Sequence, residues 1–207
     1  MRKTLILAAM LAAVPMAASA ADLSYTYVEG GWTQLRINDD LLDDPKGDGG
    51  YIRGSFAIAK QVHLFGGYST ASKSYAYGNV ARMKVEIGQP EFGIGYHMNM
   101  SDRVDFTADI AALRVNAKVK ISGAPGYNES GNEHVTAGRA TVGVRGAPSP
   151  RTEAWIKAGV MDGSDMDTSF VGNLGGQIKF NATWGVVGEI QFIEDTTQYM
   201  AGVRASF

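Results

Sequence analysis

The 207-residue chain contains no cysteine, which excludes disulfides, thiolate metal sites and cysteine catalysis. After its first 20 residues it also lacks any apolar run long enough to cross a bilayer as a helix. Proline is scarce, with 6 residues, and histidine is scarcer, with 3. These gaps leave few groups for metal binding or acid–base catalysis.

Positive charge is not in excess either. Without Arg2 and Lys3, which lie in the first 20 residues, 17 basic residues remain against 21 acidic ones. Nucleic-acid binding usually depends on clustered positive charge. We therefore expect no nucleic-acid partner.

The first 20 residues have the pattern of a secretory signal peptide. Arg2 and Lys3 precede an apolar run over 4–14, and Ala18-Ser19-Ala20 is a small-residue cleavage site. No cysteine follows that could carry a lipid anchor. We expect a signal peptide over 1–20 and a single domain over 21–207.

The remaining chain alternates between apolar and polar residues, which is the pattern of β-strands. Many of the 26 glycines lie inside these segments, where they let a curved wall bend. We predict ten strands, with eight as the alternative if neighbouring segments are misread. The predicted strands cover 23–36, 50–60, 61–70, 82–97, 103–121, 135–145, 152–161, 170–180, 184–193 and 196–207.

The final segment is a period-two strand that runs to Phe207. A closed barrel needs its last strand to pair with its first, because closure removes both sheet edges. The predicted fold is therefore all-β, a transmembrane antiparallel up-and-down β-barrel in which 196–207 pairs with 23–36. One face of the final strand carries Tyr199, Ala201, Val203, Ala205 and Phe207.

The connections between the predicted strands alternate in length. Short turns follow every second strand, and the long connections cover 37–49, 71–81, 122–134 and 162–169. Transmembrane barrels have short periplasmic turns and longer outer loops. We expect the long loops to lie outside the cell, where they are available to a surface partner.

The alternation changes parity twice. Within 82–97 the apolar residues move from odd to even positions at Gln89-Pro90, and within 103–121 they move back near Ala112-Leu113. With the turn centred on Met100, Gly88 would lie opposite Ala112. We predict paired β-bulges at this height, with the hairpin beyond them clear of the membrane.

The two faces of the predicted barrel differ in chemistry. Aromatic residues near the strand ends mark the apolar face as the lipid-facing one. The other face carries equal numbers of acids and bases, and charges in a narrow lumen must be paired or hydrated. We predict a network of ion pairs that largely fills the lumen, formed by Glu29, Arg53, Glu91, Asp105, Asp109, Arg139, Arg145, Glu153, Lys157, Lys179, Glu189 and Arg204.

Candidates for catalysis are few. His63 and His97 map to the inward face and His134 to an outer loop edge, and we interpret them as network or loop residues. A surface or lipid A hydrolase would need His134 to meet Ser130, Asp162 or Asp165. No nucleophile elbow, phosphate loop or zinc motif is present, so we predict no catalytic residue and no cofactor.

The first long connection is acidic. Oxygen ligands suit Ca²⁺ or Mg²⁺, but the spacing does not match an EF-hand loop. We interpret it as a solvated loop and predict no metal site, while divalent bridging to lipopolysaccharide stays open. Its acids are Asp39, Asp40, Asp43, Asp44 and Asp48.

The chain from Ala21 onward resembles the small outer-membrane β-barrel proteins of Gram-negative bacteria. In that family a terminal aromatic on an alternating strand is read by the barrel-assembly machinery, which implies that Tyr199, Val203 and Phe207 form the assembly signal. SYTYVEGGW (24–32) and HLFGGYS (63–69) resemble a xanthomonad-type family of vesicle-associated, immunity-eliciting surface proteins. The resemblance implies an outer-membrane location among lipid and lipopolysaccharide.

These observations predict a structural or surface-interaction role and no enzyme activity. A narrow, porin-like diffusion channel is the alternative, and a hydrolase around His134 is a third possibility.

Overall fold

The computed structural model describes residues 23–38, 45–77, 81–124, 127–164 and 166–207. The predicted signal peptide lies outside these ranges, as do Asp39, Asp40, Asp43, Asp44 and Asp165. The described part of the chain holds no helix with the length and hydropathy needed to cross a membrane.

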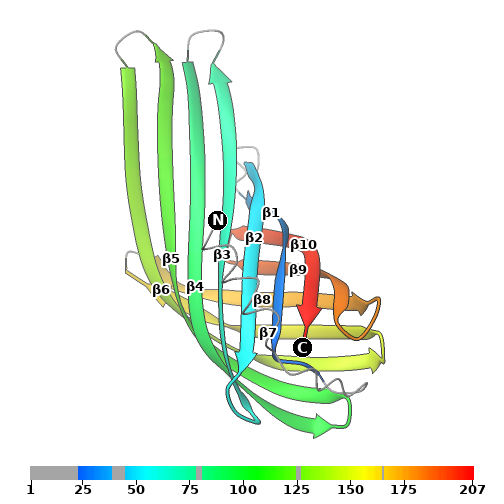
Figure 1. The fold of residues 1–207 in the computed structure, drawn as a ribbon. Coiled ribbons are helices and arrows are strands. Elements are labelled where there is room, and N and C mark those ends of the chain that lie inside the picture. Colours follow the sequence, from blue (N-terminus) through cyan, green and yellow to red (C-terminus); the bar gives the residue numbers. More distant parts are fainter. Residues whose placement is uncertain (1–22, 39–44, 78–80, 125–126, 165) are drawn as a thin grey trace, which may run out of the picture.

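The molecule is a closed antiparallel barrel of ten strands, which confirms the predicted count over the alternative of eight (Figure 1). Neighbours in sequence are neighbours in space, and β10 pairs with β1 to close the sheet. The strands are β1 (Tyr27–Ile37), β2 (Lys46–Ala57), β3 (Val62–Tyr77), β4 (Ala81–Ser101), β5 (Val104–Ala124), β6 (Tyr127–Ser149), β7 (Thr152–Gly163), β8 (Met166–Lys179), β9 (Trp184–Ile193) and β10 (Thr196–Ser206).

The wall of the barrel is much taller on one side than on the other. β4 and β5 have 21 residues each and β6 has 23, whereas β9 has 10 and β1 and β10 have 11. A strand needs only about 9–11 residues to cross a bilayer. The far ends of β3 to β6 therefore form a tall sheet that rises beyond the rest of the barrel, as Figure 1 shows.

This tall sheet corrects two of the predicted long loops. β3 continues to Tyr77 and β6 begins at Tyr127, so most of 71–81 and 122–134 is strand. The sequence alone favours loops there, because the outward residues of these segments, such as Ser72, Ser74 and Asn132, are polar. Polar residues are expected on the outer face of a strand where it extends beyond the bilayer into water. The predicted long connection over 162–169 is wrong as well, because β7 runs to Gly163 and β8 begins at Met166.

The predicted paired bulges are also wrong. Gly88 pairs with Asn116 and Glu91 with Leu113, so the register of β4 and β5 is the same on both sides of Gln89-Pro90. Ala112 lies opposite Phe92 and not opposite Gly88. The register shift in this pair lies between Asn99 and Ser101, at the turn. The parity change therefore marks a change of surroundings along unbroken strands.

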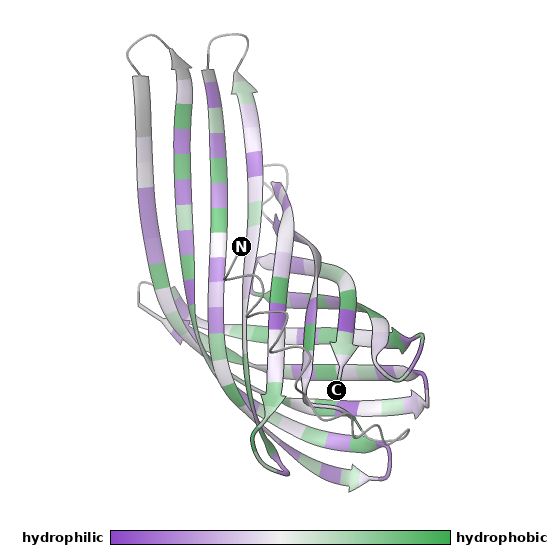
Figure 2. Ribbon diagram, viewed as in Figure 1, coloured by the Kyte–Doolittle hydropathy of each residue, from purple (hydrophilic) through white to green (hydrophobic). Residues whose placement is uncertain are grey.

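Below the parity change, the outer face is apolar and the inner face polar. Phe92 and Ile110 are 62% and 65% exposed on the outside, in the manner of lipid-facing side chains. Above it the pattern reverses, with Val85 and Val119 paired on the inner face and Lys84 and Lys120 on the outer. Figure 2 shows the resulting alternation of hydrophilic and hydrophobic residues along the tall strands.

Candidate functional site

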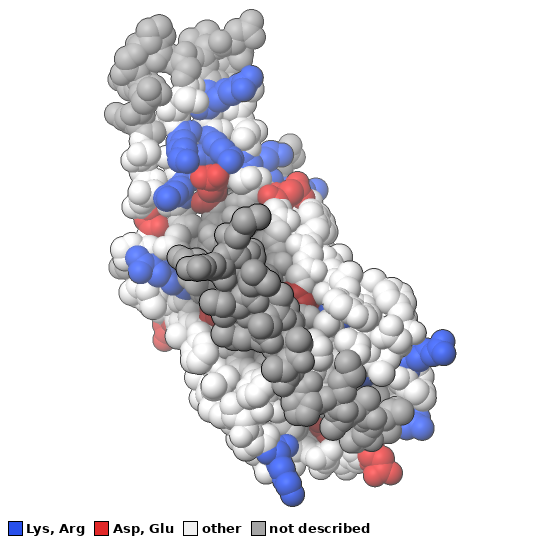
Figure 3. All heavy atoms as spheres, in the orientation of Figure 1, with Lys and Arg blue, Asp and Glu red and all other residues white. Residues whose placement is uncertain are grey.

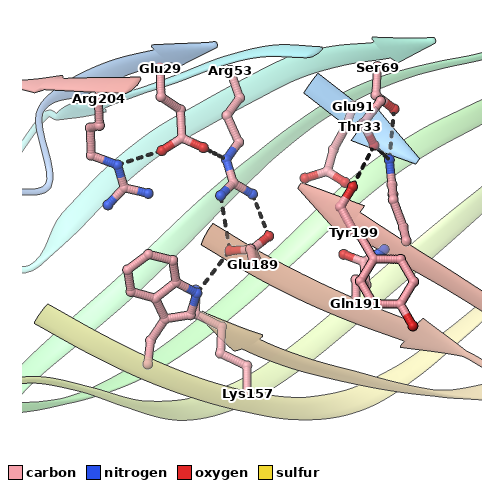
Figure 4. A network of polar contacts seen from close by, with 12 residues as sticks. Glu29, Thr33, Arg53, Ser69, Glu91, Lys157, Glu189, Gln191, Tyr199 and Arg204 are labelled. Atoms are coloured by element: carbon pink, nitrogen blue, oxygen red, sulfur yellow. Dashed lines mark hydrogen bonds and ion pairs between the residues drawn. The ribbon is translucent and has the colours of Figure 1, made fainter. Parts of the chain in front are cut away.

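A central group of charges extends into the lumen from β2, β1, β10 and β9, which are consecutive in the closed strand order. Arg53 of β2 donates through Nε to Glu29 of β1, and through its two terminal nitrogens to Glu189 of β9, at 2.6 and 2.9 Å. Arg204 of β10 donates from Nε to the other oxygen of Glu29 at 2.5 Å. Figure 4 shows Arg53 held between the two carboxylates.

Trp155 completes this group. Its indole Nε1 donates to Glu189 Oε2 at 2.8 Å, and the Arg204 guanidinium lies 5.0 Å from its ring centre. A Cβ at Gly175 would overlap the indole, so glycine on β8 makes room for the ring. The sequence reasoning missed Trp155, although it shares its parity with Glu153 and Lys157 and that alone assigns it to the lumen.

A second group lies nearer the end of the barrel with the short turns. Arg145 Nη2 and Lys179 Nζ each lie 2.5 Å from an oxygen of Glu153. The Arg145 guanidinium lies 4.7 Å from the centre of the Tyr25 ring. Glu153 is thus neutralised by two cations from different strands.

An aromatic stack accompanies this second group. His97 stacks on Tyr25 with ring centres 3.6 Å apart, and the Tyr25 hydroxyl donates to Asp105 at 2.9 Å. His63 lies 3.6 Å from Asp109, which also pairs with Lys157. Both histidines are buried, as their inward parity predicts. Tyr25 was not selected from the sequence, although it lies within the predicted strand 23–36 and shares its parity with Glu29.

A third group lies towards the tall end. Arg139 Nη2 donates to Glu91 at 2.7 Å, and its Nη1 lies 3.3 Å from Gln191 Oε1. Leu113 and Ile193 pack there against a buried apolar cluster of Ala137, Met161 and Val171. At this height an ion pair and an apolar cluster therefore lie side by side in the lumen.

Of the twelve charged residues assigned to the lumen from sequence, eleven take part in ion pairs in the structure. The remaining one, Asp105, accepts the Tyr25 hydrogen bond. Between these groups lies a cavity of about 200 Å³, lined by both signs of charge and by apolar residues such as Leu113 and Met161. The arrangement neutralises charge locally around a cavity that has room for several water molecules.

The other candidate residues are not gathered into a site. His134 is exposed on β6 and lies opposite Asn116, and among the described residues no hydrogen bond joins it to Ser130 or Asp162. Asp48 accepts a hydrogen bond from Gln34 at 2.9 Å. No group of three or more potential metal ligands occurs in the described ranges.

The predicted assembly residues lie on or beside β10. Val203 is 45% exposed on the outer face, while Tyr199 and Phe207 are half-buried. The Phe207 amide donates to the Thr26 carbonyl at 2.9 Å, and the Ser24 hydroxyl donates to the Phe207 carbonyl at 2.7 Å. These bonds tie the end of the chain to the strand with which β10 closes the barrel.

A closed barrel with a lipid-compatible exterior and a charged interior is a transmembrane β-barrel. The family model "Outer membrane protein beta-barrel domain" matches residues 5–203, and the chain therefore belongs to this family of outer-membrane proteins. A search of curated protein sequences found no match. The narrower xanthomonad-type resemblance stays a prediction.

Several solved barrels resemble the fold. The attachment invasion locus protein Ail of Yersinia pestis is 13% identical, with a TM-score of 0.49 over 90% of this chain and 100% of that chain. Neisserial surface protein A is 16% identical, with a TM-score of 0.46 over 89% and 98%. The N-terminal barrel domain of Pseudomonas aeruginosa OprF is 12% identical, with a TM-score of 0.42 over 89% and 100%.

Proposed function

We propose that this outer-membrane barrel is a non-enzymatic protein that acts at the cell surface, and that its own side chains close its lumen. The observation that carries the proposal is the series of contacts from Arg53 of β2 through Glu189 of β9 to Trp155 of β7, because β2 and β7 are opposite one another in the closed strand order. The tall sheet supplies the surface on which such a protein would meet a partner. The short-turn end would then face the periplasm, as in other transmembrane barrels.

The closure has a physical basis. Breaking a buried ion pair by removing one partner typically costs about 3–5 kcal/mol, because it leaves an uncompensated charge. Glu29, Glu189 and Arg204 are each less than 10% exposed and share one connected group. A solute that passed between these side chains would have to break several buried ion pairs at once and replace them with contacts of its own.

Planar-bilayer recording tests the proposal. We expect purified wild-type protein to produce no stepwise conductance. A quadruple variant, Glu29→Ser, Arg53→Ser, Glu189→Ser and Arg204→Ser, keeps the net charge constant and removes the central group. It should conduct, and retained heat-modifiable gel mobility would show that it still forms a barrel. Stepwise conductance by the wild type would contradict closure.

A narrow diffusion channel is the second candidate. The cavity of about 200 Å³ between the charged groups favours it, because that space could admit water or a small ion. The same recordings distinguish the two candidates. A channel would give discrete wild-type steps whose ion selectivity changes in Arg139→Gln, at the tall end of the lumen.

Export and assembly complete the proposal. The first 20 residues would be removed on export, and the aromatic Phe207 would then engage the barrel-assembly machinery. No metal or cofactor is required for a surface role of this kind.

A further inference from the structure

The outer face of the tall sheet carries a concentration of positive charge. Outward-facing even positions on β4 and β5 hold five cations and one described acid, Glu86. We call the five cations the basic face: Arg82, Lys84, Arg114, Lys118 and Lys120. All five are exposed, and Figure 3 shows Lys and Arg side chains gathered on the tall part of the molecule.

The pairing of the strands brings these cations together. Lys84 lies opposite Lys120, and Lys118 lies opposite Glu86. Glu86 is shared by two of them, at 2.6 Å from Lys84 Nζ and 3.6 Å from Lys120 Nζ. Like charges directly opposite one another destabilise a sheet. One carboxylate leaves a net charge of four on this face, an arrangement suited to an anionic ligand.

The basic face begins where the lipid-facing surface ends. Ile110 and Ala112 are the last apolar residues on the outer face of β5, and Arg114 follows them directly. Lys118 and Lys120 continue up the same face, so the cations extend over about 20 Å of strand at roughly 3.4 Å per residue. They form a ladder that rises from the membrane surface.

Neutral polar side chains flank the ladder. Lys120 lies opposite Ser130 of β6, Lys118 opposite Asn132, and Lys84 opposite Ser74 of β3. Hydroxyl and amide groups hydrogen-bond to sugars, while Lys and Arg bind phosphate oxygens. A phosphorylated saccharide that stands upright beside the barrel matches both features.

We propose that the basic face binds the phosphate groups of the lipopolysaccharide molecules that surround the barrel in the outer leaflet. Arg114 lies at the height of the phosphates next to the acyl chains, and Lys84, Lys118 and Lys120 lie at the height of phosphates on the core sugars. The proposal rests on the orientation given under Proposed function, but not on a closed lumen.

Binding of rough-type lipopolysaccharide to the refolded barrel in phosphatidylcholine nanodiscs tests this assignment. The test variant is Lys84→Gln, Lys118→Gln, Lys120→Gln. The matched control is Lys60→Gln, Arg103→Gln, Arg151→Gln, which removes three exposed cations at the short-turn end. A surface cation contributes a factor of about five to binding an anionic membrane. We expect affinity to fall on the order of a hundredfold in the test variant and to change little in the control.

Chemically dephosphorylated lipopolysaccharide should bind the wild type as weakly as intact lipopolysaccharide binds the test variant. Equal affinities of wild type and test variant would overturn the proposal, as would full binding of the dephosphorylated form. Stronger binding of a sulfated oligosaccharide than of lipopolysaccharide would also overturn it, because the partner would then come from outside. Conductance recorded on the same samples bears only on the proposed closure of the lumen.

Discussion

Arg204, three residues before the end of the chain, donates a hydrogen bond of 2.5 Å to Glu29, the third residue of β1. The two residues are also direct partners in the β1–β10 register. The strand pair that closes the barrel is therefore joined by an ion pair as well as by backbone hydrogen bonds. Glu29 also accepts a hydrogen bond from Arg53, so it links the strand pair that closes the barrel to the other charges of the central group.

Removing the charge of Glu29 should destabilise the barrel strongly. Glu29→Gln leaves two guanidinium groups facing a neutral amide, and we expect a loss of about 3–5 kcal/mol in the free energy of unfolding. Urea unfolding in detergent, followed by tryptophan fluorescence, measures the change. Glu86→Gln, on an exposed strand, is the control and should shift the midpoint little. Equal midpoints for the two variants would contradict the central role of Glu29.

Trp155 offers a test of one buried hydrogen bond. Trp155→Phe keeps an aromatic ring but removes the donor to Glu189, and a hydrogen bond to a charged group contributes about 1.5–3 kcal/mol. The matched change Trp184→Phe affects a side chain that is 51% exposed. Thermal unfolding should show a clear loss only for Trp155→Phe. A similar loss in both variants would mean that the bond to Glu189 contributes nothing specific.

Deletion of Phe207 should impair assembly. Its backbone bonds to Thr26 and Ser24 hold the end of the chain against the first strand, and its side chain is the expected signal for the assembly machinery. The amount of heat-modifiable barrel in outer-membrane fractions measures the effect. Phe180→Ala changes another aromatic, 61% exposed near the β8–β9 turn, and should assemble normally. Normal levels of the deletion mutant would remove the assembly role.

The boundary of the lipid-facing surface can be located with introduced thiols. The native chain has no cysteine, so a single substitution provides the only reactive group. A membrane-impermeant maleimide should label Glu86→Cys in intact cells but not Phe92→Cys, six residues further along the same face. Lys60→Cys, at the opposite end, should react only after the cells are opened. Labelling of Lys60→Cys in intact cells would reverse the orientation.

Glu86 provides a gain-of-function test of the basic face. The hydrogen bond and charge of Lys84, with the charge of Lys120, hold the pKa of the Glu86 carboxyl below its usual range. It therefore stays ionised at pH 7, and its charge is lost only when the pH falls through that lowered pKa. Glu86→Gln removes it at neutral pH and should tighten lipopolysaccharide binding about fivefold at low salt. Weaker binding would show that Glu86 positions the lysines instead.

Alternation alone was enough to predict the ten strands and to assign most of the lumen residues to the inner face. Glu29 and Arg204, for example, share the polar face of their strands, and closure of β10 on β1 brings them together. It was not enough above the membrane, because apolar residues face outward only where lipid surrounds the barrel, and Val85 and Val119 face inward above it. At Gln89-Pro90 the surroundings change and the backbone register does not, so the same pattern was interpreted as a bulge.

The partners within the lumen were beyond sequence reasoning for a different reason. Parity assigns Arg53 and Glu189 to the interior, but it does not say which strands face one another across it. That depends on the tilt and curvature of the closed sheet. Trp155 shows the same limit, since an aromatic at an inward position is understood only when Glu189 and Gly175 are seen beside it.

The unequal height of the wall gives the barrel a front and a back within the plane of the membrane. A neighbour that approaches β3 to β6 meets a polar screen that stands above the lipid, whereas one that approaches β9, β10 or β1 meets strands that end near the lipid surface. Rotation of the protein about the membrane normal therefore changes what it presents to each neighbour. Where such barrels are crowded together in the membrane, we would expect them to pack with a preferred rotational orientation about the membrane normal.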